Sequence, residues 1–390
     1  MDKIEELLTR GVANIIPGKK ELEKALRSGK KLNIYSGFDA TAPKLTLGHT
    51  VPFRKLQALA DLGHNVTFLI GDFTTLIGDN SDKEAERPAI TSKEIKENFK
   101  TYQAQAGKVL DFSKVQVKFN SEWLDKLSFS DVVRLCQNFS VGDFISRELV
   151  KKRLNDGKRV GLHELLYPVM QGYDHYYMDT DLQIGATEQT FNMQTGRTLQ
   201  KLNRDKESFI MTLDILEGTD GRRMSKSWGN AIWLEDLAED MYAKVMAISD
   251  DLIIQYYTLA TNIPMKKITQ IESSLKNGGS PMVIKKDLAF EIVKELHSSK
   301  DAESAKKNFE KTVQQKEMPT DMEVISLLGG LTASEVLVQT GLAVSRSDAK
   351  RLIEQNGVSL NDKKITDPEA IISEGILKKG RSLRKIVIKK

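Results

Sequence analysis

The chain has very little cysteine and no long apolar run. Its single cysteine, Cys136, excludes a disulfide within the chain and a zinc cluster built from thiolates. No apolar stretch approaches the ~20 residues that a membrane-spanning helix needs. The charged first segment, MDKIEELLTR, also lacks the apolar core of a signal peptide. We therefore expect a protein of the reducing cytoplasm.

Composition and charge point to a globular protein with a basic C-terminal module. The chain has 390 residues, which suits two or three domains, and 40% of them are hydrophobic and 29% charged. Residues 341–390 hold twelve Lys and Arg against six Asp and Glu, whereas the whole chain carries only +4. This asymmetry favours an anionic partner, nucleic acid above all; the alternative is a solvated basic tail.

Strand-like and helix-like segments alternate in the first part of the chain. Strands are expected at 31–38, 65–73, 115–120, 181–186 and 208–216, and helices at 2–8, 19–28, 49–63, 92–111 and 188–202. We expect Ser92 to cap the helix that it begins and Gly63 to end the helix before it. The alternation predicts an α/β fold with a parallel sheet covered by helices on both faces. Such sheets bind ligands beyond the carboxyl ends of their strands, where strand order reverses.

Changes in the pattern of expected helices and strands divide the chain into three predicted domains. Residues 1–231 carry the alternation, with a helical insertion at about 121–165. Residues 232–317 read as helix after helix, which predicts an α-helical domain. The polar segment EMPTDME, 317–323, is a predicted linker to the basic module at 324–390.

Two stretches have the composition of a phosphate site. Gly48 and His49 begin a predicted helix, where free N–H groups and the helix dipole favour anions, although this pair alone is more often structural. EGTDGRRMSKSWGN, 217–230, reads as a loop after a strand, and its Arg223 and Lys226 suit a polyphosphate. The alternative for this loop is a solvated basic surface.

Two further stretches place polar side chains on predicted helices. In LIGDNSDKEAERP, Asp79 could hold an ammonium group, and Lys83 and Arg87 could share one helical face, although a charged helix cap is the better interpretation of this segment alone. In LLYPVMQGYDHYY, spacing puts Tyr167, Gln171 and Asp174 on one stripe. That stripe predicts a pocket with hydrogen-bonding groups; the alternative is aromatic packing at a core edge.

These stretches carry a family resemblance. TLGH at 46–49 and RMSKS at 223–227 resemble the two signatures of class I aminoacyl-tRNA synthetases, and together with YSGFDATAP, YPVMQGYD and LQIGATEQ they look like the bacterial tyrosyl-tRNA synthetases. The resemblance covers essentially the whole chain. It implies a Rossmann-like catalytic domain, an α-helical domain facing the anticodon, and a small α+β RNA-binding domain shared with a small-subunit ribosomal protein. It also implies L-tyrosine, ATP with Mg²⁺, and tyrosine tRNA as partners, and a homodimer joined through the insertion.

The resemblance also implies roles for particular residues. Tyrosine would be held by Tyr35, Asp79, Tyr167, Gln171, Asp174 and Gln189. The ATP site would be lined by Gly37, Asp39, Thr41, Gly48, His49, Glu188 and Lys226. The transfer itself would be assisted by Thr46, His49, Lys83, Arg87, Arg223 and Lys226. No residue needs to become covalently attached, because positioning and charge stabilisation suffice.

Five positions depart from the family pattern. Thr46 replaces a histidine, Glu188 an aspartate and Arg223 a lysine, whereas Ala186 and Asp82 each replace a glycine. These departures bear on the rate and on the affinity for ATP more than on the class of reaction.

The C-terminal module has features of RNA recognition of its own. Ser345 is a predicted N-cap, and the helix after it presents a basic stripe of Arg346, Lys350 and Arg351. Gly357 is the expected helix stop, and a hairpin is expected around Asn361 and Asp362. Phosphate contacts would dominate the affinity of such a module.

Three other functions compete with this one. The nearest is an enzyme of the same fold that uses tryptophan, against which Tyr35 and Asp174 argue. The others are a cytidylyltransferase-like enzyme and an RNA-binding paralogue without catalysis, which Thr46 and Asp82 would favour.

Overall fold

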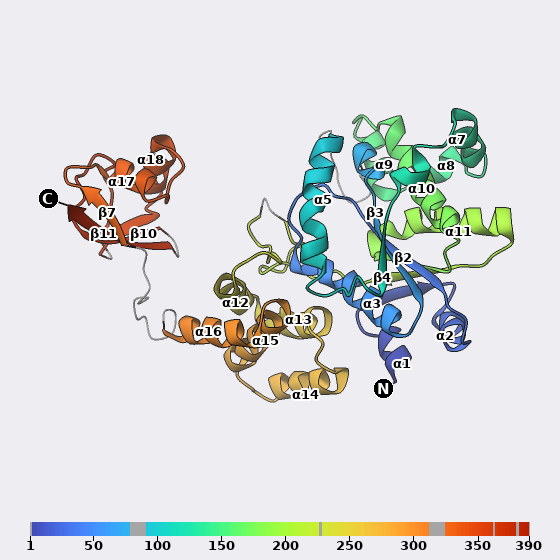
Figure 1. Cartoon of the computed structure of the whole chain (residues 1–390), viewed down its shortest axis with the longest axis horizontal. Coiled ribbons are helices and arrows are strands. Elements are labelled where there is room, and N and C mark those ends of the chain that lie inside the picture. Colours follow the sequence, from blue (N-terminus) through green and yellow to red (C-terminus); the bar gives the residue numbers. More distant parts are fainter. Residues whose placement is uncertain are drawn as a thin grey trace. The chain divides into compact units, whose positions relative to one another are not determined.

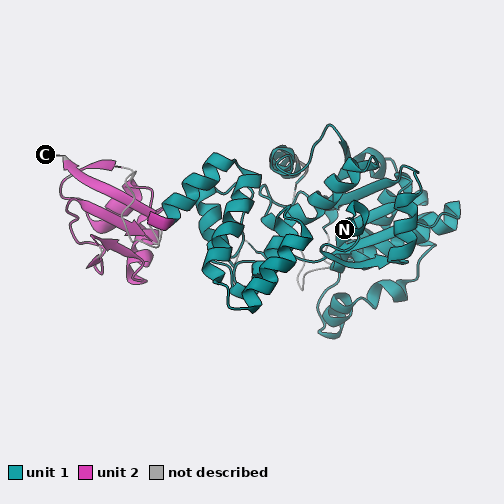
Figure 2. Ribbon diagram, turned by 90° about the horizontal axis from the view of Figure 1, so that it is seen from below, with its two compact units in different colours: residues 1–309 teal, residues 310–390 magenta. Residues whose placement is uncertain are grey.

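A computed structural model describes residues 2–78, 91–225, 228–311, 324–361, 363–379 and 382–389. The chain forms two compact units, residues 1–309 and 310–390 (Figure 2). The predicted linker at 317–323 lies outside the described residues. No helix in the described ranges is long and apolar enough to cross a membrane.

The first unit is built on a six-stranded sheet in the order β1-β6-β5-β2-β3-β4 (Figure 1). Its strands are β1 (Val12–Ile16), β2 (Asn33–Phe38), β3 (Asn65–Ile70), β4 (Val115–Phe119), β5 (Leu182–Ala186) and β6 (Phe209–Leu213). Strands β2 to β6 pair in parallel, as predicted. The sequence analysis did not predict β1, an edge strand that pairs antiparallel with β6. Only Ile15 of β1 is buried, so this edge strand lacks an alternating apolar pattern.

Strand order reverses between β2 and β5. From β2 the chain moves outward through β3 to β4, and it then returns to the other side of β2 to add β5 and β6. The carboxyl ends of β2 and β5 therefore diverge into loops on opposite sides, which leaves a crevice between them.

Helices follow the strands as the alternation predicts. Those of the sheet-bearing part are α1 (Lys3–Leu7), α2 (Lys19–Arg27), α3 (Thr50–Asp61), α4 (Thr74–Ile77), α5 (Ser92–Ala106), α10 (Leu162–Tyr177) and α11 (Thr190–Arg204). Gly63, at φ +88°, follows the end of α3 as expected. The N-cap of α5 is Thr91 and not Ser92, because Thr91 forms a reciprocal capping box with Glu94.

Short helices fill the predicted insertion, and longer ones follow the sheet. The insertion contains α6 (Ser121–Leu124), α7 (Phe129–Cys136), α8 (Val141–Ile145) and α9 (Glu148–Asn155). After β6 come α12 (Ala238–Met246), α13 (Ile253–Ala260), α14 (Met265–Lys276), α15 (Pro281–Leu296) and α16 (Ser299–Phe309). Buried residues of α12, α13 and α15 share one continuous core with the sheet. The division into three domains stays a prediction.

The second unit is a small α+β fold with its own core. Its strands are β7 (Val324–Leu328), β8 (Val358–Leu360), β9 (Lys363–Lys364), β10 (Gly375–Lys379) and β11 (Ser382–Lys389), and its helices are α17 (Ala333–Gln339) and α18 (Arg346–Glu354). Ser345 caps α18 as predicted, and β8 and β9 form the expected hairpin. Gly357 is not the helix stop: the left-handed residue after α18 is Asn356, at φ +55°.

Candidate active site

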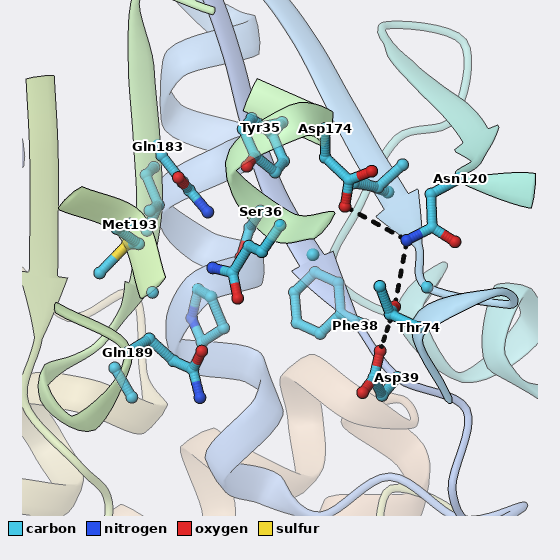
Figure 3. A pocket seen from close by; sticks show the side chains of 18 of the residues that line it. Tyr35, Ser36, Phe38, Asp39, Thr74, Asn120, Asp174, Gln183, Gln189 and Met193 are labelled. Atoms are coloured by element: carbon cyan, nitrogen blue, oxygen red, sulfur yellow. Dashed lines mark hydrogen bonds between the residues drawn. The ribbon is translucent and has the colours of Figure 1, made fainter. Parts of the chain in front are cut away.

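A cavity of about 310 Å³ occupies the crevice between β2 and β5 (Figure 3). It brings together predicted site residues from four separate parts of the sequence. Those that line it are Tyr35, Gly37, Asp39, Thr41, His49, Tyr167, Gln171, Asp174, Glu188, Gln189 and Arg223. The predicted Asp79, Lys83, Arg87 and Lys226, and the departure Asp82, lie outside the described residues.

Asp174 is buried at one end of the cavity and is held by two donors. The indole Nε1–H of Trp123 donates to Oδ1 at 2.7 Å, and the amide of Asn120 donates to Oδ2 at 3.2 Å. Burial raises the pKa of this carboxyl to about 8, against the opposing effect of the two hydrogen bonds. A carboxyl group in this state readily exchanges a proton or a hydrogen bond with a ligand hydroxyl.

Tyr35 lies beside this carboxyl with its hydroxyl unsatisfied. Its side chain is 1% exposed, and within the described parts of the chain its Oη has no hydrogen-bond partner. Burial, with the nearby Asp174 charge, raises the pKa of Tyr35 well above its ordinary value. An unpaired buried hydroxyl costs about 1–3 kcal/mol, so this end of the cavity is complementary to a polar ligand group.

A chain of hydrogen bonds runs from Asp174 along the wall of the cavity. Asn120 donates to Thr74 Oγ1 at 3.0 Å, and Thr74 donates to Asp39 Oδ1 at 3.0 Å (Figure 3). Asp39 Oδ2 also accepts from the hydroxyl of Tyr167 at 3.0 Å. Tyr167, expected to hold tyrosine, and Asp39, expected at ATP, are thus bonded to each other.

Sequence reasoning missed the residues that hold Asp174. Trp123 comes from α6, while Asn120 follows the carboxyl end of β4 and Thr74 that of β3. Their positions after strands were the available signal, because polar residues at such ends face the ligand crevice. Gln183, on β5, also lines the cavity and was not predicted.

His49 is oriented by the residue that departs from the family pattern. The backbone N–H of Thr46 donates to His49 Nδ1 at 3.1 Å, and Thr46 Oγ1 lies 2.9 Å from the same nitrogen. Burial lowers the pKa of His49 to about 4, so the ring is neutral. Because Nδ1 accepts, the ring proton sits on Nε2, where it can be donated to a ligand. Thr46 itself is not among the residues that line the cavity.

Gly37 lines the cavity, whereas Gly48 is not among the lining residues and only precedes one of them, His49. A Cβ at Gly48 would meet its nearest neighbour, Thr46 Oγ1, at 3.5 Å, and one at Gly37 would meet Leu69 at 3.9 Å. Both are ordinary contacts, and neither glycine has a positive φ. At Gly37 the space is available to a ligand that approaches the backbone closely.

Glu188, expected at ATP, forms an ion pair with Arg223, expected to assist the transfer. Arg223, from the second signature, lies 3.3 Å from the carboxylate of Glu188. The neighbouring Arg222 turns away, to Asp220 and over the ring of Trp228. Within the described ranges no group of three or more His, Cys, Asp or Glu could hold a metal ion.

The three predicted RNA-contacting cations of the second unit are exposed and paired. Arg346 contacts Glu335 at 2.6 Å, and Lys350 contacts Glu369 at 3.2 Å. Arg351 contacts Asp348, one turn earlier on the same helix, at 2.6 Å. These pairs lie at the surface, where each contributes about 0–1 kcal/mol and can be exchanged for another anion.

Comparison with known proteins agrees with this geometry. The family described as tRNA synthetases class I (W and Y) matches residues 27–314, and the S4 domain family matches residues 335–375. The tyrosine–tRNA ligase 2 of Vibrio cholerae is 41% identical over 365 residues, which are 93% of this chain and 92% of that protein. The tyrosine–tRNA ligase of Thermotoga maritima is 40% identical, over 93% of this chain and 90% of that protein.

Solved structures share the fold of the first unit. A truncated mitochondrial tyrosyl-tRNA synthetase of Coccidioides posadasii has a TM-score of 0.64 and 23% identity, covering 79% of this chain and 92% of that one. The tyrosyl-tRNA synthetase of Archaeoglobus fulgidus, solved with L-tyrosine, has a TM-score of 0.61 and 20% identity, covering 78% and 100%. The resemblance noted in the sequence is confirmed: this chain belongs to the class I tRNA synthetases of the tryptophan and tyrosine family, and it carries an S4 domain.

Proposed function

We propose that this chain is a tyrosine–tRNA ligase whose cavity binds tyrosine and ATP. Its relatives that are about 40% identical carry this activity in their names. Tyrosine is favoured over tryptophan by one end of the cavity, where the Tyr35 hydroxyl, which has no partner among the described residues, lies beside the buried Asp174. A phenol hydroxyl satisfies both groups, because it accepts from Tyr35 while it donates to Asp174.

The reaction proceeds in two displacement steps. A carboxylate oxygen of tyrosine attacks the α-phosphorus of ATP, and the bond to the bridging oxygen breaks to release pyrophosphate. A hydroxyl of the terminal ribose of tyrosine tRNA then attacks the carbonyl carbon of the adenylate; AMP leaves, and the hydroxyl proton passes to solvent. Positioning and charge stabilisation carry both steps.

Residues at the other end of the cavity serve the nucleotide. The Nε2–H of His49 donates to a phosphate oxygen, and Gly37 and Gly48 let the nucleotide lie against the backbone. Glu188 binds the ribose hydroxyls, and Arg223 neutralises the phosphates, so their ion pair is exchanged when ATP binds. Lys83, Arg87 and Lys226 add positive charge around the pyrophosphate. Mg²⁺ would accompany ATP and would supply positive charge that neutralises the phosphates.

Two chains form a homodimer through the helical insertion. Helix α7 buries none of its residues, although it is rich in apolar ones. The exposed apolar side chains of this region are Phe129 (85%), Val141 (69%), Leu162 (74%) and Val133 (44%). An isolated chain seldom exposes so many large apolar side chains in one region, and a second copy would cover them.

The remaining parts of the chain face the tRNA. Residues 232–317 are the anticodon-side domain, and residues 324–390 bind RNA through Arg346, Lys350 and Arg351. The S4 match supports the second assignment. RNA phosphates replace the carboxylates that now pair with these cations, so affinity falls as salt rises. We propose that the enzyme acts in the cytoplasm.

ATP–pyrophosphate exchange tests the proposal. The assay is run on the full chain with tyrosine, tryptophan, phenylalanine or no amino acid. Exchange that depends on tyrosine supports the proposal, whereas exchange driven by tryptophan refutes it. No exchange with any amino acid, together with retained tRNA binding, would instead identify an RNA-binding paralogue.

A further inference from the structure

A buried histidine lies directly behind the aryl end of the cavity. His175 follows Asp174 on α10 and has no exposed surface. Its ring meets the Tyr35 ring edge-on, with centroids 6.0 Å apart. Helix α11 passes so close that a Cβ at Gly196 would lie 2.6 Å from the Cβ of His175. Packing on two sides therefore holds the imidazole in one place.

The hydrogen bonds of His175 fix its tautomer. Nδ1 lies 3.3 Å from Gln183 Oε1, and Nε2 lies 2.9 Å from Ser208 Oγ. Burial lowers the pKa of His175 to about 3, so the ring is neutral and carries a single proton. Since a carbonyl oxygen only accepts, that proton is on Nδ1, and Nε2 accepts from the Ser208 hydroxyl.

This arrangement decides which end of the Gln183 amide faces the cavity. Gln183 on β5 is the register partner of Tyr35 on β2, so the two side chains lie next to each other on the same face of the sheet. With Oε1 engaged by His175, the amide nitrogen points toward the middle of the cavity (Figure 3). Within the described residues this Nε2 has no hydrogen-bond partner. It is a fixed donor at the end of the cavity assigned to the phenol.

We propose that His175 is a positioning residue for substrate recognition: it holds the Gln183 amide so that Nε2 donates to the hydroxyl oxygen of bound tyrosine. The inference rests on the proposed function and deepens it. The phenol oxygen then accepts from Gln183 as well as from Tyr35, while its proton goes to Asp174. Phenylalanine leaves the amide unpaired, so the His175–Gln183 pair adds to the rejection of that substrate.

Pyrophosphate exchange on His175 variants of the full chain tests the inference. His175→Phe keeps the ring volume but cannot donate to Gln183; it should raise the KM for tyrosine about threefold to tenfold, the effect of one hydrogen bond, and leave the KM for ATP within about twofold. His175→Asn keeps an N–H near the position of Nδ1 and should restore much of the tyrosine KM. In a Gln183→Ala background, His175→Phe should change the tyrosine KM little further, because the histidine acts through the amide.

Several outcomes overturn the inference. An unchanged tyrosine KM in His175→Phe does so, as does an equal effect in the presence and absence of Gln183, or a parallel rise of both KM values that His175→Asn fails to rescue. If His175→Phe does not fold, Ser208→Ala, which removes a single atom, is the second variant. It should raise the tyrosine KM about twofold, because Nε2 of His175 then loses the donor that fixes the tautomer. An unchanged tyrosine KM in Ser208→Ala overturns the proposal. If the wild-type chain gives no tyrosine-dependent exchange, the proposed function itself fails.

Discussion

Tyr35→Phe should affect stability and substrate recognition differently, because the Tyr35 hydroxyl has no hydrogen-bond partner among the described residues. Removing a buried hydroxyl that is unpaired relieves a cost of about 1–3 kcal/mol. The variant should therefore unfold at the same temperature as the wild type or at a higher one. Most buried substitutions destabilise a protein, so this outcome is specific to an unsatisfied group.

The same substitution should weaken the binding of tyrosine. In the proposed complex the hydroxyl makes a hydrogen bond worth about 0.5–1.5 kcal/mol, so its loss should raise the KM for tyrosine about threefold to tenfold. Preference for tyrosine over phenylalanine in pyrophosphate exchange should fall by a similar factor. The KM for ATP should stay within about twofold, because the proposed nucleotide site is at the other end of the cavity.

Tyr257→Phe is the matched control. The Tyr257 hydroxyl is also buried, but it donates to the backbone carbonyl of Ile284 at 3.1 Å, within the helices that follow the sheet. Its loss should cost about 1 kcal/mol of stability and leave the tyrosine KM unchanged. The reasoning is refuted if Tyr35→Phe lowers the unfolding temperature as much as Tyr257→Phe does, or if it leaves substrate preference intact.

Three other variants probe the carboxylates and the insertion. The pKa of Asp174 rises from 3.8 to about 8 on folding, so its contribution to stability is complete below pH 3.8 and is lost as pH rises toward 8; Asp174→Asn should flatten the fall of the unfolding temperature across that window, and an unchanged slope would contradict the assignment. Glu188→Gln, which removes the negative charge that pairs with Arg223, should raise the KM for ATP roughly tenfold through weaker ribose binding but leave the KM for tyrosine unchanged; the reverse pattern in the exchange assay would exclude the ribose role. Phe129→Asp should convert a dimer to a monomer in light scattering, and a wild-type chain already monomeric at micromolar concentration would refute the proposed interface.

Local patterns in the sequence predicted the elements and one face of the site. Helical spacing is a property of a short segment, so Tyr167, Gln171 and Asp174 could be assigned to one stripe, and all three line the cavity. The alternation of strands and helices likewise predicted the parallel strands and the crevice at their carboxyl ends.

Contacts between distant elements could not be predicted in this way. Trp123 and Asn120 bond Asp174 from segments about fifty positions earlier, and no short-range pattern links them. The pairing of Glu188 with Arg223 depends in the same way on how two loops meet. The edge strand β1 was missed because one buried residue in five gives no periodicity. The ion pairs of Arg346 and Lys350 with Glu335 and Glu369 were not predicted either, because spacing on a helix says nothing about partners from other elements.

A crystal structure of the full chain with tyrosine bound would test the central claim most directly. The account predicts that the phenol oxygen lies within hydrogen-bond distance of both Tyr35 Oη and the Asp174 carboxyl, with the ammonium group at the opposite end of the ligand. A structure in which the ammonium group meets Asp174, or in which the Tyr35 hydroxyl stays unpaired beside the bound ligand, would contradict it.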